Sequence, residues 1–188
     1  MHRTLAGNVL GRETLAALAR EPQPGYAGAM DIPRDYLVWI ADTEFKGKSF
    51  NGPSLVETLR SLSAEEATST ETYEGYSAWA VALHVLYFKY MIGKELGATL
   101  PAYGYEENGW PALPEDRSQA AYEAMIGELE AFHAAVMDAF GKASVEKLES
   151  PMPGWKIPLG NAFAWLAAHD TNHNTQIRNM GLASLKER

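Results

Sequence analysis

The chain has 188 residues with a hydrophobic share of 46% and a charged share of 21%, which fits one globular domain with a buried core. Its net charge of -8 argues against a nucleic-acid surface, because phosphate binding depends on clustered Lys and Arg. Without cysteine there is no disulfide, thiolate ligand or Cys nucleophile, so a metal site would depend on His, Asp or Glu.

Residues 1–30 are weakly patterned, and we interpret them as an N-terminal extension to a domain formed by residues 31–188. A short helix is possible at Arg12–Ala19, before a Pro- and Gly-rich breaker. Glu13 and Arg20 interrupt the only apolar stretch of this segment, so we expect no secretory signal peptide. The expected location is the cytoplasm.

The first core helix is predicted over residues 31–47. Asp31 is a suitable cap, Pro33 falls in the first turn, and Gly47 ends the pattern. Apolar residues recur between them at helical spacing. This stripe consists of Leu37, Ile40, Ala41 and Phe45.

Two capping boxes follow in the sequence. Ser54 with Glu57 predicts the start of a short helix that runs to Leu62. Ser63 with Glu66 repeats the same signature. We therefore expect one or two short helices after the first long one.

The most apolar segment, Ser77–Leu96, predicts a helix that is hydrophobic all round and hence buried. The longest uncharged run, Gly75–Phe88, is too short to span a bilayer about 30 Å thick as a helix, so we expect no membrane partner. Residues 97–114 are rich in Gly, Pro and aromatic side chains and predict a long irregular connection.

Two further long helices complete the pattern. One covers Asp116–Gly141, with Gln119 completing its cap, and the other begins at Pro158 or Asn161 and is closed by Gly181. Alternating apolar residues do not persist anywhere, so we predict no substantial sheet. The expected fold is all-α, with four long helices in an up-down bundle whose first link is long enough to cross over.

Three histidines form the candidate metal site. On a helix, His169 and His173 lie on one face, about 5–6 Å apart at Cβ, and imidazole nitrogens bind divalent metals at about 2.0–2.1 Å. His84, in the middle of the buried helix without a nearby carboxylate, is the best third ligand. His133 lacks a helical partner histidine, and we interpret it as a structural or rim residue.

Two other metal architectures fit less well. A ferritin-like di-iron bundle needs a carboxylate from every helix, and Ser77–Leu96 has none before Lys94 at its last turn. The doublet His169-Asp170 is found in phosphohydrolases of the HD type, but those need a further Asp downstream, and none follows.

The sequence identifies no catalytic side chain. Gln176, one turn beyond His173, would orient a bound water or ligand, or would be an exposed polar residue near a helix end. Asp170 would support a ligand histidine or be solvated, and Arg178 would receive a carboxylate or interact with the helix dipole. For four Trp residues the sequence allows two interpretations: they line a pocket, or they belong to the core. The core position is the commoner one for aromatic residues in a helical bundle. The four are Trp79, Trp110, Trp155 and Trp165.

The order and spacing of His84 and the later His169-x-x-x-His173-x-x-Gln176 resemble the DinB/YfiT-like superfamily. The resemblance covers roughly residues 31–182. It includes the Gly-Pro-Ser-Leu element at 52–55 and the Trp-Pro pair at 110–111. The sequence departs from the usual motif with Asn172 in place of a common histidine, and with Asn174 and Thr175 in place of Arg and Gly.

This resemblance implies a four-helix bundle, often dimeric, that binds a divalent metal (Zn²⁺, Ni²⁺ or Fe²⁺) through residues matching His84, His169 and His173. Characterised members include thiol transferases that use bacillithiol, mycothiol or glutathione, and a maleylpyruvate isomerase. We therefore expect a metal-dependent transferase or hydrolase that activates a bound thiol or water and acts on a small molecule. The alternatives are a metal-binding or stress-response protein without a dedicated substrate, and a plain helical dimer whose histidines are structural.

Overall fold

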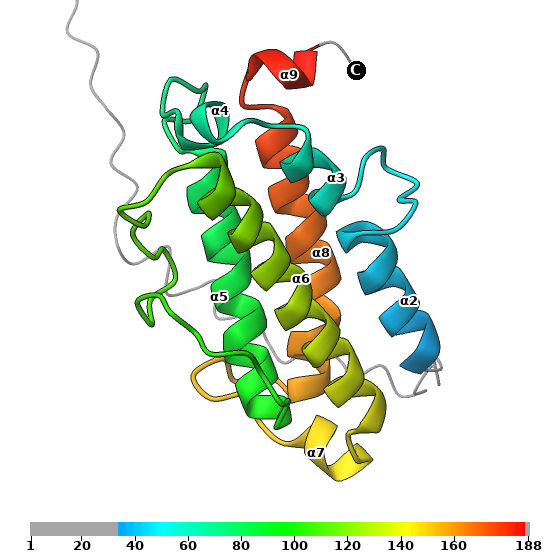
Figure 1. Cartoon of the computed structure of the whole chain (residues 1–188). Helices are drawn as coiled ribbons and strands as arrows, with labels where there is room; N and C mark the ends of the chain where they lie inside the picture. Colours follow the sequence, from blue (N-terminus) through cyan, green and yellow to red (C-terminus); the bar gives the residue numbers. More distant parts are fainter. Residues whose placement is uncertain (1–33, 187–188) are drawn as a thin grey trace, which may run out of the picture. The chain divides into compact units, whose positions relative to one another are not determined.

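The computed structural model describes residues 34–186, and within them the protein is all-α, as predicted, with eight helices and no strand (Figure 1). The predicted extension 1–30, the possible helix Arg12–Ala19 and the expected cap at Asp31 lie outside the described residues. The helices are α2 (Arg34–Phe45), α3 (Leu55–Arg60), α4 (Ala64–Thr68), α5 (Ala78–Leu96), α6 (Gln119–Lys142), α7 (Val145–Glu149), α8 (Leu159–Arg178) and α9 (Ala183–Lys186).

The four longest helices pack side by side. Helix α5 packs against α6 and α8, and α2 packs against the same two helices from the other side (Figure 1). Helices α2 and α5 are therefore diagonal neighbours, and the link that carries α3 and α4 crosses one end of the helical layer. The link was predicted to be long enough for this path.

The helix starts follow the predicted caps except at α6. The boxes Ser54/Glu57 and Ser63/Glu66 are both formed and begin α3 and α4. Helix α6 is capped by Ser118 instead of the expected Asp116. The carboxylate of Asp116 accepts a bond of 2.9 Å from the Ser118 backbone N–H, so it closes the turn before the helix and leaves the cap to the serine.

Short helices are more numerous than predicted, because α7 and α9 join α3 and α4. Helix α7 has five residues and α9 four, too few for a hydrophobic period to show in the sequence. Helix α8 starts after Pro158, as one of the two predictions had it. It ends at Arg178, with Asn179 as its C-cap, whereas Gly181 (φ 82°) makes the turn into α9.

The long helices enclose an apolar core that positions α5 against α8. Trp79 is fully buried beside Tyr122, so the prediction of a core role is confirmed for this tryptophan. Among residues 34–186, no helix combines the length and the apolar character needed to cross a membrane.

Candidate metal centre

The three predicted histidines meet in the interior, where α5 contributes His84 and α8 contributes His169 and His173. The Nε2 atom of His169 lies 3.2 Å from that of His84 and 3.1 Å from that of His173. All three residues are buried, and they form a group whose ligand atoms lie within 4.8 Å of one another. Two parts of the chain that are 85 residues apart in the sequence therefore meet in space.

Hydrogen bonds on the outer nitrogens fix two of the rings. The Nδ1–H of His84 donates to the carbonyl of Gly109. The Nδ1–H of His173 donates to Oε1 of Gln176 over 2.7 Å, and the Nε2 amide of Gln176 donates in turn to the carboxylate of Glu74. Because these Nδ1 atoms carry the protons, the neutral rings direct unprotonated Nε2 atoms at His169.

This donor set fits a metal ion. Nitrogen ligands at about 2.0–2.1 Å from a tetrahedral ion lie roughly 3.3 Å apart, close to the two distances measured here. Two lone pairs pointing at one place also repel each other unless a cation or a proton lies between them. The residues present are those that Zn²⁺, Ni²⁺ or Fe²⁺ would take as ligands.

Two of the rings, those of His169 and His84, are also held in the uncharged form that metal binding needs. Burial lowers the pKa of His169 to about 2, and His173 and His84 contribute further. Burial lowers the pKa of His84 as well, against a smaller opposing effect from the Gly109 carbonyl. At neutral pH both rings therefore keep a free lone pair.

Aromatic side chains enclose the histidines. Trp110 stacks on His84 with a centroid distance of 4.1 Å and an interplanar angle of 22°, and Trp165 lies 4.2 Å from His169. Phe88 makes T-shaped contacts with the rings of His84 and His169, with a centroid distance of 4.9 Å in each pair. The histidines keep only 9% (His84), 5% (His169) and 8% (His173) of their exposure, so water has limited access to the group.

A second buried polar cluster lies beside the site. Lys89 donates to Oδ2 of Asp170 at 2.6 Å and to Nδ1 of His133 at 3.1 Å, and Nε2–H of His133 donates to Asp42 at 3.1 Å. Lys89, Asp170 and His133 have no exposed side-chain surface. Asp170 is therefore neither solvated nor bonded to a ligand histidine, and both interpretations of it were wrong. His133 is structural, as predicted.

Comparisons with protein-family models, curated proteins and solved structures give no match. The resemblance to the DinB/YfiT-like superfamily accordingly depends on the sequence motifs alone.

Several residues at the site were not found from the sequence. Glu74 and Gly109 lie in irregular segments. Trp110, for which a core position was the commoner expectation, is 45% exposed and stacks on His84. Lys89 carried a usable signal, because it is the one charged residue in the predicted buried helix before its last turn, and such a charge needs a partner. Arg178 is absent from the metal centre and donates instead to the Asn51 carbonyl at 2.8 Å.

Proposed function

We propose that this protein is a divalent-metal-dependent enzyme of the DinB/YfiT-like type, a thiol transferase or hydrolase built on a four-helix bundle. The observation that carries the proposal is the convergence of three Nε2 atoms, two of which belong to rings whose Nδ1 protons are already bound. His84, His169 and His173 would hold the ion.

An ion held by three neutral imidazoles acidifies a water or a thiol, which supplies a nucleophile at neutral pH. The chain itself orients the ligands and limits water. Gln176 and the Gly109 carbonyl keep two rings in the required tautomer, and Trp110 covers His84. A low-molecular-weight thiol with a small electrophile, or a hydrolysable small molecule, would be the reactants.

The test is the metal content of untagged protein, measured by elemental mass spectrometry. We expect near-stoichiometric metal in the wild type, loss in His84→Ala and retention in the matched variant His133→Gln, which changes a buried histidine outside the group. Metal-free wild type that also fails to take up added Zn²⁺ or Ni²⁺ would contradict the proposal. Metal-loaded protein would then be assayed for thiol transfer and hydrolysis.

The shielding of the three histidines from solvent favours a second candidate function, that of a metal-binding protein without a dedicated substrate. Trp110 lies across His84, and the three histidines are almost fully buried. Replacing Trp110 by Ala separates the two candidates, because it opens the site. An enzyme would change its KM or kcat, whereas a metal-binding protein would change only the rate at which a chelator removes the ion.

Removing the side chain of Gln176 is expected to weaken metal binding by about 10–100-fold, the usual effect of losing a group that orients a ligand histidine. The reason is that His173 loses the acceptor of its Nδ1 proton. Competition with a chromophoric chelator measures the affinity of Gln176→Ala. Gln119→Ala is the control, because Gln119 bonds the Ala64 backbone far from the histidines, and equal affinities in the two variants would refute the role of Gln176.

A further inference from the structure

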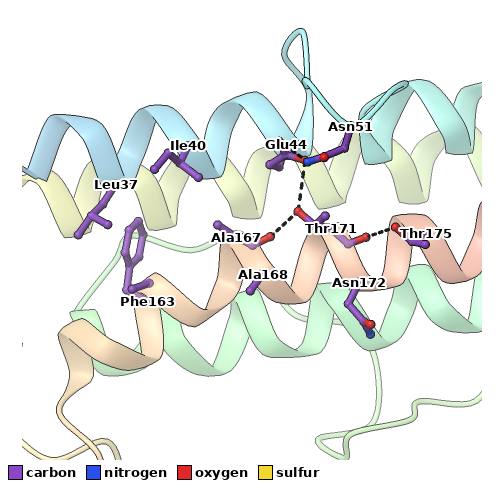
Figure 2. Close-up of a pocket in the computed structure, with 11 residues that line it drawn as sticks. Leu37, Ile40, Glu44, Asn51, Phe163, Ala167, Ala168, Thr171, Asn172 and Thr175 are labelled. Atoms are coloured by element: carbon purple, nitrogen blue, oxygen red, sulfur yellow. Dashed lines mark hydrogen bonds between the residues drawn. The ribbon is translucent and has the colours of Figure 1, made fainter.

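Helix α8 has a second face, directed at α2, that lines a cavity. A groove of about 620 Å³ runs between the two helices, on a side of α8 that the metal ligands do not use (Figure 2). Leu37, Ile40 and Phe163 lie at one end of it, and Asn51 and Thr175 lie at the other (Figure 2). The volume is within the range of small-molecule sites, which is roughly 300–1,000 Å³.

The polar end of the groove continues into a second cavity of about 540 Å³. Asn51, Thr171 and Thr175 line both cavities, so the two adjoin. Arg178 and Thr58 line only the second one. The apolar groove, which we call the trough, therefore leads into the polar second cavity, which we call the chamber. The chamber contains the guanidinium group of Arg178.

The guanidinium of Arg178 has a fixed position, but most of its N–H groups have no hydrogen-bond acceptor among the described residues. It lies against Gly52 (φ 112°), where an added Cβ would come within 2.8 Å of Nη1, and it donates to the Asn51 carbonyl. This is its single hydrogen bond among residues 34–186, and no carboxylate in that range lies within ion-pair distance. Arginine has five N–H donors, so most of them are free.

Other groups in the two cavities also favour an anion at this end. The Thr58 hydroxyl is buried without a hydrogen-bond partner in the described part of the chain. The one carboxylate of the groove, Glu44, already accepts from Ser49 (2.9 Å) and Asn51 (3.2 Å). The chamber therefore offers the free N–H groups of Arg178 and the Thr58 hydroxyl as donors to an anion.

We propose that this cleft binds an amphipathic carboxylate, with the alkyl chain in the trough between α2 and α8 and the head group on Arg178. The site is independent of the metal centre, because it uses the opposite face of α8. A guanidinium pairs with a carboxylate through two parallel hydrogen bonds, and the apolar trough covers the chain.

Isothermal titration calorimetry of the full chain with dodecanoate, below its micelle concentration, tests the proposal. We expect one molecule per chain, at least about tenfold weaker binding to Arg178→Gln, and weak binding of butyrate, which has the head but not the chain. Arg117→Gln is the matched control, since Arg117 is exposed and, among the described residues, bonds only the Pro114 carbonyl. Ala164→Trp, at an exposed position of the groove, should block dodecanoate without unfolding the protein.

Three outcomes would overturn the proposal. One is no binding of dodecanoate. Another is equal binding by the Arg178 and Arg117 variants, or tighter binding of dodecyltrimethylammonium, which would make Glu44 the selective group. The third is a chain that is dimeric in solution and becomes monomeric in Ala164→Trp, because a second copy would then occupy the groove. Metal content, measured in parallel, tests the metal proposal separately.

Discussion

Replacing Lys89 by Met is expected to lower the free energy of unfolding by about 3–5 kcal/mol, which is the cost of removing one partner from a buried ion pair. The side chain fits sterically, so the loss would come from charge and not from packing. Urea denaturation followed by circular dichroism at neutral pH, with a chelator present, measures the change.

The surroundings of Lys89 explain the size of this effect. Its ammonium donates to Asp170 and His133 and lies 4.4 Å from the centre of the Phe45 ring, so all sides of the charge are occupied. Burial lowers the pKa of Lys89, and Asp170 partly opposes that shift. Without the lysine, Asp170 would be a buried carboxylate with neither oxygen bonded to a described residue.

The double variant Lys89→Met/Asp170→Leu separates the value of the pair from the cost of breaking it. Removing both charges leaves no unpaired charge, and only Nδ1 of His133 loses its donor, so we expect most of the lost stability to return. Lys94→Met is the control, because Lys94 lies on the same helix with an exposed side chain, and it should change stability by no more than about 0.5 kcal/mol. A Lys89 variant as stable as the control would show that the pair is energetically neutral.

The part of the fold that could be predicted is the part encoded over short distances. Ser54 and Glu57 are three residues apart and satisfy each other, so their sequence suffices to begin a helix. Asp116 and Ser118 illustrate the limit, because both are good caps and only the path of the preceding turn decides between them.

The metal centre, too, was predictable only where it depends on residues close in the sequence or on the burial of one helix. The spacing of His169 and His173 places them on one face, and the buried position of His84 makes it a candidate. The groups that fix the orientation of the histidine rings cannot be predicted from sequence spacing. Gly109 acts through a backbone carbonyl, which any residue has, and Glu74 lies 102 residues from Gln176. Their roles arise from tertiary packing alone.

The metal-free protein is expected to lose stability steeply as the pH falls below 6.5. Burial lowers the pKa of His169 to about 2 and that of His133 further, whereas an unfolded chain has His pKa values of about 6.5. Between these limits the unfolded state binds more protons, so the free energy of unfolding decreases with falling pH. Each histidine contributes about 1.4 kcal/mol per pH unit, or roughly 2.7 for both.

Urea titrations with a chelator between pH 7.5 and 5 would measure this slope, in a range where most carboxylates remain ionised. His133→Gln and His169→Gln should each remove about half of the contribution, because each takes away one buried group that resists protonation. The slope is the quantity to compare, since either substitution also changes stability at every pH. Unchanged slopes in both variants would mean that these two histidines take up protons over the same pH range in the folded and unfolded states, and a His169 ring that accepts a proton in the fold would compete poorly for a metal ion.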